Sequence, residues 1–326
     1  YLALVVCAAM VKFLDAYRRK PSFAGTYKEL ILLGISASYL LFTLSRTGYL
    51  AILVTAVLTV PLVCLSMENR WKRLSQSVGM MALAALVCFP VVFTAQRILP
   101  SVAAEPELHE IEEIPTELMH GRDMDSYYYI TVERFVQVFQ MKVLGIPEED
   151  CLNAFLFFSS ADDVPLYTEP YLMEKEPILL ASTEDMAAAA AQEAEKEESY
   201  TNGRFYIFRQ YYNNLNAFGH EDMGITEADG NFLVHAHNIY LQVAYDHGIY
   251  VGIVFILLGA GSLIQSFLYF RKRKDDTVCA ALPFAILVLF AVAGLAEWIF
   301  HPCCPIAYCL LLTLAPLLFD IRREEI

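Results

Sequence analysis

Charged residues are scarce in this chain. Of its 326 residues only 18% are Asp, Glu, Lys or Arg, against about a quarter in a typical soluble domain, while 57% are hydrophobic and the mean hydropathy is +0.44. This scarcity excludes an ordinary soluble protein and indicates a membrane protein. The sequence opens at Tyr1 inside an apolar stretch, so we expect it to be the later part of a longer membrane chain.

Basic residues are fewer still. The chain has 23 Lys and Arg against 37 Asp and Glu, for a net charge of −14, which argues against a nucleic-acid partner. The imbalance is local, because residues 96–240 hold 27 acids and 8 bases, whereas the remaining residues sum to +5. The sequence therefore combines an apolar, slightly basic frame with one long acidic insert.

Neither a disulfide pattern nor a metal-binding motif is present. Five of the eight cysteines lie inside apolar runs, where cysteine behaves as a small hydrophobic residue. These are Cys7, Cys64, Cys88, Cys279 and Cys309. A zinc site of His235, His237 and His247 matches no fixed ligand spacing, and no calcium-binding loop is found. We expect neither a metal nor another cofactor.

Several apolar runs have the character of helices that cross a hydrocarbon core about 30 Å thick. They are Tyr1–Leu14, Leu30–Leu44, Tyr49–Leu65, Val78–Ala95, Gly248–Phe270, Val278–Phe300 and Pro305–Phe319. One helix over Leu30–Leu65 would be about 54 Å long, so the Ser45–Gly48 step must break it. The runs predict an all-α polytopic membrane protein with at least seven transmembrane segments: residues 1–95 and 241–326 are membrane helices, and residues 96–240 form one domain outside the membrane.

Basic clusters fix the predicted orientation. Under strict alternation of the spans, 14 of the 23 bases fall on one side, which the positive-inside rule assigns to the cytoplasm. They are Lys12, Arg18, Arg19, Lys20, Lys28, Arg70, Lys72, Arg73, Arg271, Lys272, Arg273, Lys274, Arg322 and Arg323. The opposite side receives Ser45–Gly48, the acidic insert and His301–Cys304, so the insert is expected to be extracytoplasmic.

The insert is too long for a simple loop and should have structure of its own. Helical apolar spacing occurs over Asp125–Leu144 and again over Asn202–Ala217. Ala181–Ser199 is rich in alanine and glutamate, which is typical of a solvated acidic helix or a disordered stretch, and it suggests no chemistry.

Two residue types suggest chemistry at the outer face. Arg46 lies between two membrane runs, where an arginine is costly and therefore functional by default, and its guanidinium suits a phosphate. For Arg97, Arg134 and Arg209, an interfacial position or an ion pair is the simpler interpretation. His237 precedes a helix that enters the outer leaflet and could act as a general base. Alternatively, His237 or Asn238 merely caps that helix.

Three sequence blocks together resemble the O-antigen ligase and O-antigen polymerase superfamily of membrane glycosyltransferases. Ser45-Arg46-Thr47-Gly48-Tyr49-Leu50 is similar to the family's Ser-Arg-x-Gly block, and residues 203–209, beginning Gly-Arg, are similar to its loop block. His237-Asn238-Ile239-Tyr240-Leu241, with the glycines that follow, is similar to its His-Asn-x-Tyr-Leu block. The order and spacing of the blocks around one outer loop make the match more specific than any block alone, although the acidic middle of the insert matches nothing in the family.

The resemblance implies a GT-C-like, all-helical enzyme of the bacterial inner membrane that needs no metal. Such an enzyme moves a glycan from a polyprenyl-diphosphate-linked donor to a hydroxyl of a glycan, lipid or protein acceptor at the outer face. It would bind membrane lipids and no nucleic acid. By this resemblance Arg46 and Arg204 bind the diphosphate, and His237 deprotonates the acceptor hydroxyl.

Further residues receive supporting roles from the same resemblance. Asn238 or Tyr240 would orient the sugar, and Arg209 is a weaker phosphate ligand. Arg122, in a second Gly-Arg pair, is an alternative to Arg204 as the loop arginine. Two acids are further candidates. Glu297 is an intramembrane acid that would contribute to the site and pair with Arg46, and Asp246 would orient His237 or remain an ordinary surface acid.

Other functions remain open. Polymerase and ligase use the same donor, so the sequence does not separate them. A transporter or flippase of an anionic solute or lipid-linked glycan would use the arginines for binding, but it predicts charges within several spans and internal repeats. A surface anchor or sensor whose insert binds a cation or a partner is a third possibility.

Overall fold

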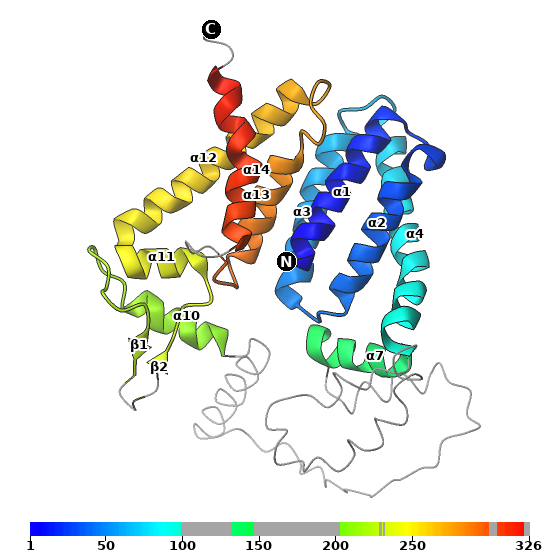
Figure 1. The fold of residues 1–326 in the computed structure, drawn as a ribbon. Helices are drawn as coiled ribbons and strands as arrows, with labels where there is room; N and C mark the ends of the chain where they lie inside the picture. Colours follow the sequence, from blue (N-terminus) through cyan, green and yellow to red (C-terminus); the bar gives the residue numbers. More distant parts are fainter. Residues whose placement is uncertain (99–131, 147–202, 228–229, 231, 300–304, 323–326) are drawn as a thin grey trace, which may run out of the picture. The chain divides into compact units, whose positions relative to one another are not determined.

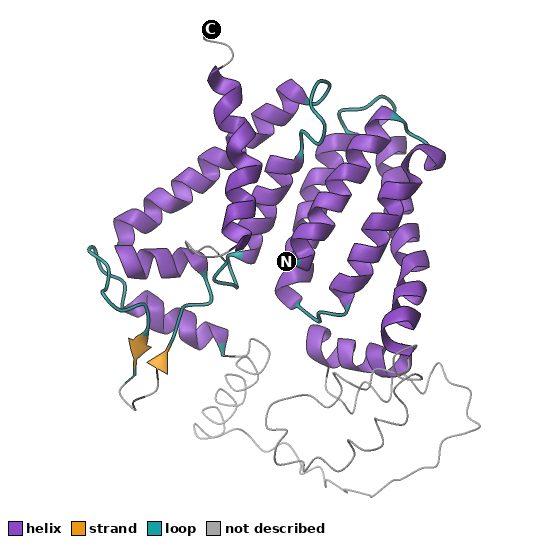
Figure 2. Cartoon of the chain, viewed as in Figure 1, coloured by secondary structure: helices purple, strands orange, loops and turns teal. Residues whose placement is uncertain are grey.

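The computed structural model describes residues 1–98, 132–146, 203–227, 230, 232–299 and 305–322. Within these residues the chain is almost entirely helical, with one short pair of strands (Figures 1 and 2). It divides into two compact units, a larger one of Tyr1–Ile130 with Ile207–Ile326 and a smaller one of Thr131–Tyr206. The predicted site residues Arg46, His237 and Glu297 all belong to the larger unit.

Long helices make up most of the larger unit. In chain order they are α1 (Leu2–Arg19), α2 (Phe23–Leu41), α3 (Arg46–Cys64), α4 (Arg70–Phe93) with a π-helical end η1 (Thr94–Ile98), α11 (Ile239–His247), α12 (Ile249–Arg273), α13 (Leu282–Ala293) and α14 (Pro305–Arg322). The buried core lies mainly among α1, α2, α3 and α13, whose side chains include Phe13, Leu33, Val60 and Ile286. A smaller core under α11 is formed by Tyr211, Ala236 and Tyr245.

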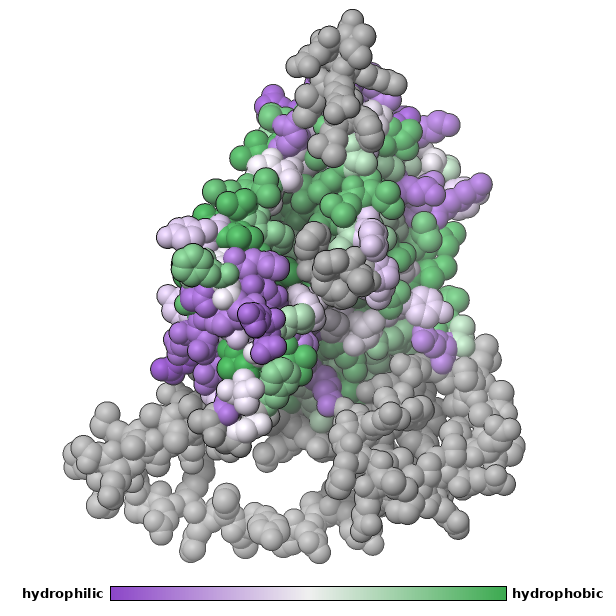
Figure 3. Space-filling view, turned by 60° about the vertical axis from the view of Figure 1, so that its left-hand side comes forward, coloured by the Kyte–Doolittle hydropathy of each residue, from purple (hydrophilic) through white to green (hydrophobic). Residues whose placement is uncertain are grey.

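Three helical segments are long and apolar enough to cross a membrane: α3, Arg70–Gln96 and α12. Their outward side chains are hydrophobic; Leu86 and Leu258, for example, are 72% and 65% exposed. Figure 3 shows the face on the α12 side, where hydrophobic residues cover much of the upper part and hydrophilic residues gather at the top and at the lower left. Because such a surface is unfavourable in water, the helices indicate a membrane protein. The described residues are mostly helical and compatible with the predicted all-α class, whereas the seven spans and the GT-C-like class stay predictions.

The predicted break between the second and third apolar runs is confirmed. Helix α2 ends at Leu41 and α3 begins at Arg46. Leu44 turns the chain with a positive φ of 49°, and the Ser45 hydroxyl accepts a hydrogen bond from the Gly48 amide at 3.1 Å. The serine is thus the N-cap of α3, and Gly48 supplies the amide that the cap needs. This geometry places Arg46 in the first turn of a long apolar helix.

The prediction of one span over Val278–Phe300 is wrong in its extent. Helix α13 covers only Leu282–Ala293, and the chain turns after Gly294. The carbonyl of Gly294 accepts a hydrogen bond from the Ile239 amide at 2.9 Å, and a Cβ at Gly294 would lie 2.6 Å from Ile239 Cγ2. The start of α11 therefore packs directly on the end of α13. Because the helix has ended, Glu297 and Trp298 lie in the turn and loop that follow and not on α13.

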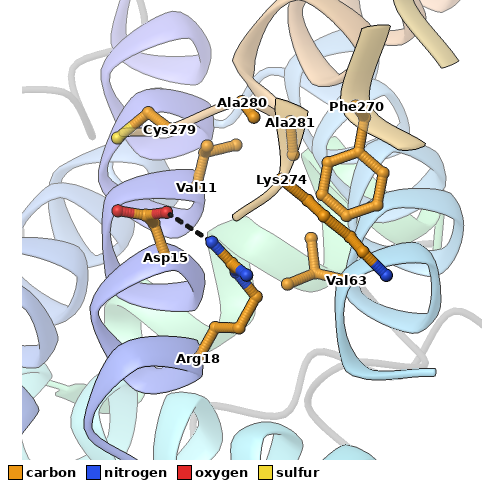
Figure 4. A pocket seen from close by; sticks show the side chains of 9 residues that line it. All are labelled: Val11, Asp15, Arg18, Val63, Phe270, Lys274, Cys279, Ala280 and Ala281. Carbon is orange, nitrogen blue, oxygen red and sulfur yellow. Dashed lines mark ion pairs between the residues drawn. The ribbon is translucent and has the colours of Figure 1, made fainter. Parts of the chain in front are cut away.

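Basic residues gather at one end of the larger unit. Arg18, at the end of α1, forms an ion pair with Asp275, beyond α12, at 2.6 Å, and Arg73, in α4, donates to the Pro21 carbonyl at 3.4 Å. Figure 4 shows Arg18, Asp15 and Lys274 around a narrow pocket there. The basic ends of α1, α4 and α12 thus share one side, as the alternation predicts, and the Ser45 turn lies at the opposite end (Figure 1).

Two predicted helices of the acidic insert are present in the described residues. The pattern over Asp125–Leu144 corresponds to α7 (Val132–Phe139) with its π-helical end η4 (Gln140–Leu144), and the pattern over Asn202–Ala217 corresponds to α10 (Arg204–Asn213). Strands β1 (Ile225–Thr226) and β2 (Phe232–Leu233) form an antiparallel pair before α11. Ala181–Ser199 lies outside the described residues.

Helices α2 and α4 approach each other closely at Gly34. A Cβ at this position would lie 2.6 Å from both the Ala84 carbonyl oxygen and the Cys88 sulfur. We expect Gly34→Leu to destabilise the protein by about 1–3 kcal/mol, because the extra side chain forces the two helices apart. Thermal unfolding in detergent measures the effect. Gly79→Ala, on α4, is the matched control, since a Cβ there meets nothing within 4 Å and the unfolding midpoint should be unchanged or raised. An unchanged midpoint for Gly34→Leu would contradict the close packing.

Candidate functional site

The histidine segment is fixed to the end of α13. Asn238 is the N-cap of α11, and its Oδ1 accepts from the amides of Tyr240 and Leu241 at 3.0 and 3.1 Å. Its Nδ2 donates to the Leu295 carbonyl at 3.0 Å. The capping interpretation of Asn238 is therefore confirmed, and both ends of its amide are engaged with backbone. Orientation of a sugar by Asn238 stays a prediction.

Tyr240 also contacts backbone. Its hydroxyl donates to the Ala291 carbonyl at 2.8 Å, two residues before the end of α13. Together with Asn238, this bond holds the first turn of α11 against α13. A role for Tyr240 in orienting a sugar likewise stays a prediction, and the structure gives it a positioning role in addition.

The two histidines before α11 lie together in a strained loop. His237 has a φ of 48°, in the left-handed region that non-glycine residues rarely adopt. The ring centroids of His235 and His237 are 4.1 Å apart, and the Trp298 ring lies 5.3 Å from that of His235. Strained backbone persists only where surrounding contacts enforce it, and it is concentrated at functional sites.

A carboxylate and a hydroxyl complete this arrangement. Thr47, beside Arg46 in the first turn of α3, donates from Oγ1 to Glu297 Oε1 at 3.4 Å. Glu297 in turn acts electrostatically on His235. Thr47, His235, His237, Glu297 and Trp298 therefore form one group, here named the histidine–glutamate cluster. It joins the first and third sequence blocks, which are far apart along the chain.

The environment of His235 disfavours the charged form of its ring. Burial lowers its pKa, the neighbouring His237 lowers it further, and the carboxylate of Glu297 acts in the opposite direction. The neutral ring is thus favoured down to a lower pH than in an unfolded chain. A neutral imidazole has a ring nitrogen that can accept a proton.

We expect Glu297→Gln to lower the pKa of His235 further, because the variant removes a carboxylate that raises it. A histidine with a lowered pKa costs stability as pH falls below its unfolded value near 6.5, so acidification should destabilise the variant more than the native chain. Unfolding midpoints at about pH 7.5 and about pH 5 measure this difference. Glu221→Gln, at an exposed acid, is the control. Equal acid sensitivity of the native chain and Glu297→Gln would contradict the electrostatic effect of Glu297 on His235.

The predicted arginines fall in different places. Arg46 is half-buried next to Thr47 and so adjoins the cluster through its neighbour. Arg204 begins α10 and belongs to the smaller unit, so its meeting with Arg46 and His237 stays a prediction. Arg209 is exposed on α10. Arg122 lies outside the described residues.

The acid proposed to orient His237 contacts another residue. Asp246 accepts a hydrogen bond from Gln242 Nε2 at 2.8 Å, one turn earlier on α11. Burial raises its pKa, and this hydrogen bond and the nearby His247 and His220 act against that rise. The bond with Gln242 favours the interpretation of Asp246 as an acid of the α11 surface and gives it a structural partner.

Three residues of the site were not predicted. Thr47 and Trp298 stood beside predicted residues without a role of their own, and Gln242 was not considered. Gln242 is fully buried on α11, between Ile239 and Tyr245 on the same buried face. The sequence signal for Gln242 is its place three residues after Ile239 on an otherwise apolar helix face. A glutamine buried there must find hydrogen-bond partners for its amide.

The cluster offers imidazoles, a carboxylate and a hydroxyl, which suit proton transfer and the binding of hydroxyl groups. Among the described residues, no three His, Cys, Asp or Glu side chains are grouped so that they could hold a metal ion, and the five cysteines seen there are free thiols. The zinc interpretation of His235, His237 and His247 thus gains no support.

Comparison with known proteins gives no further assignment: no family profile, no curated protein and no solved structure matches this chain.

Proposed function

We propose that this protein is a membrane glycosyltransferase of the O-antigen ligase or polymerase type. It transfers a glycan from a polyprenyl-diphosphate-linked donor to an acceptor hydroxyl at the extracytoplasmic face of the bacterial inner membrane. In this proposal the chain contributes at least seven spans of a GT-C-like fold, and the basic end of the larger unit faces the cytoplasm.

One observation carries the proposal. The bond from Thr47 to Glu297 spans 250 residues of sequence and joins the Ser-Arg-Thr-Gly turn to the paired histidines. Both elements lie at the end of the larger unit away from the basic clusters (Figure 1). Transfer from a lipid diphosphate requires a phosphate-binding side chain and a proton acceptor, and the proposal takes them from two blocks that are far apart in the sequence.

The proposed reaction assigns a bond change to each group. His237 accepts the proton of the acceptor hydroxyl as its oxygen attacks the anomeric carbon of the donor sugar. The bond from that carbon to the diphosphate oxygen breaks, and its electron pair leaves with the polyprenyl diphosphate. Arg46 and Arg204 stabilise the negative charge that grows there. Arg46 lies in the first turn of α3. Because a helix N-terminus favours a negative ligand, this position adds to the binding of the diphosphate by Arg46.

Glu297 has a supporting place in this scheme. Its carboxylate accepts a hydrogen bond from Thr47 and interacts electrostatically with His235. In this scheme it keeps the imidazoles close to the turn that carries Arg46. Trp298 contacts His235 from the same segment and limits its movement.

A reconstituted system tests the function directly. Purified protein in proteoliposomes would be given a polyprenyl-diphosphate-linked glycan and an acceptor. The proposal expects a new glycosidic bond together with free polyprenyl diphosphate. A flippase would instead move the intact donor between leaflets and form no new bond, and that outcome would sink the proposal. Comparing a second donor molecule with a lipid core as acceptor separates a polymerase from a ligase.

A further inference from the structure

Gln242 connects three segments around the candidate site. Its side chain is fully buried, and its Oε1 accepts a hydrogen bond from the Ala236 amide at 2.7 Å. Its Nε2 donates to the Met223 carbonyl at 3.0 Å and to Asp246 Oδ1 at 2.8 Å. One side chain therefore ties the loop before α11 to the segment leading into β1 and to α11 itself.

The orientation of this amide is unique. Ala236 offers an N–H, which only the oxygen of Gln242 can accept, whereas the Met223 carbonyl offers only an acceptor. A reversed amide would place oxygen against oxygen and leave a buried amide group unsatisfied. No other natural side chain of similar size both accepts one hydrogen bond and donates two in this arrangement.

The bond to Ala236 acts at the most constrained point of the site. Ala236 is fully buried between His235 and His237, and His237 has the left-handed backbone. A residue in that conformation keeps it only while neighbouring contacts hold the chain. Asn238 secures the loop on its C-terminal side, and Gln242 secures it at its centre.

We propose that Gln242 is a positioning residue that holds His235 and His237 in their working geometry. This inference rests on the proposed function for its catalytic meaning, since Gln242 acts through the histidines and not on the substrate. It gives α11 a second role. Asn238 caps this helix, and Gln242, one turn later in the same helix, holds the loop that precedes it.

Four variants of the full-length chain in detergent test the inference. Gln242→Met keeps the shape and removes all three bonds. Gln242→Glu keeps the acceptor for Ala236 but sets a carboxylate against Asp246. Gln242→Glu combined with Asp246→Asn restores a donor opposite that carboxylate. Ser266→Ala is the matched control, because Ser266 is a fully buried polar residue on α12 that bonds only within its own helix.

Two measurements are made on each variant. Hydrogen exchange of the amides at residues 235–238 reports the loop, and kcat and KM for glycan transfer report the reaction. For Gln242→Met we expect exchange about ten- to a hundredfold faster, the change expected for loss of a buried hydrogen bond. We expect kcat to fall by a similar factor with KM nearly unchanged, because the proposed donor ligands are untouched. Gln242→Glu should behave alike, and adding Asp246→Asn should recover at least part of both losses.

The outcomes separate the two proposals. Normal exchange in Gln242→Met, or full kcat in that variant while His237→Ala is inactive, would overturn the positioning role. Faster exchange in Gln242→Met together with full activity of His237→Ala would overturn the proposed function and leave the positioning of the loop standing. If Gln242→Met does not fold, the comparison of Gln242→Glu with and without Asp246→Asn decides, and absence of rescue overturns the inference.

Discussion

Replacing His237 by alanine should lower glycan transfer by about 10²–10⁴-fold, the contribution typical of a positioned general base. The effect should fall on kcat, because the variant removes the proton acceptor and leaves the proposed diphosphate ligands Arg46 and Arg204 in place. In cells, untransferred or unpolymerised lipid-linked glycan should accumulate at normal protein levels. Both readouts measure the same step, one with purified components and one in the membrane.

His247→Ala is the matched control for that experiment. His247 ends α11 and is exposed, so the variant removes an imidazole from the helix that follows His237 without touching the histidine–glutamate cluster. It should transfer glycan as the native chain does. Full product from His237→Ala would remove His237 from the scheme, and equal losses in both variants would point to damage of α11 and not to the chemistry.

Local signals were enough for most of the helices. The length of the apolar stretch over Leu30–Leu65 required a break, and Ser45 with Gly48 three residues later provided the cap that places it. The period of apolar residues likewise located α10. Such features depend on neighbours along the chain, so they can be predicted from a single sequence.

The short helix α13 shows where local signals fail. The run over Val278–Phe300 is apolar throughout much of its length, yet the helix ends at Ala293 because the start of α11 packs against Gly294. That contact joins Ile239 and Gly294, which are 55 positions apart in the sequence, so the composition around α13 does not reveal it. The same turn brings Glu297 and Trp298 to the histidines.

The candidate site was predicted in part for a similar reason. Its first and third blocks were found from motif resemblance. Glu297 accepts a hydrogen bond from Thr47, the residue after Arg46, and its pairing with Arg46 stays a prediction. Gln242 was missed because its role depends on Ala236 and Met223, which reach it only in the folded chain. Hydrogen-bond partners of buried amides are a property of tertiary structure.

Arg46→Ala should lower kcat by about 10²–10³-fold, the loss seen when one group that stabilises a developing negative charge is removed. The charge on the departing diphosphate would then be offset by fewer cations in a region of low dielectric. Arg46→Lys should recover only part of the rate, because an ammonium keeps the charge but lacks the two-pronged geometry that matches a phosphate. Release of polyprenyl diphosphate by purified protein measures both variants.

Arg271→Ala provides the control, since Arg271 lies at the exposed basic end of α12, on the opposite side of the larger unit from Arg46. Its transfer rate should match that of the native chain. The order native, lysine, alanine in decreasing rate at Arg46 would place a phosphate beside the first turn of α3. Equal rates for all three residues at this position would show that Arg46 does not bind the diphosphate. The diphosphate would then have to bind away from the first turn of α3, where Thr47 donates a hydrogen bond to Glu297 of the histidine–glutamate cluster.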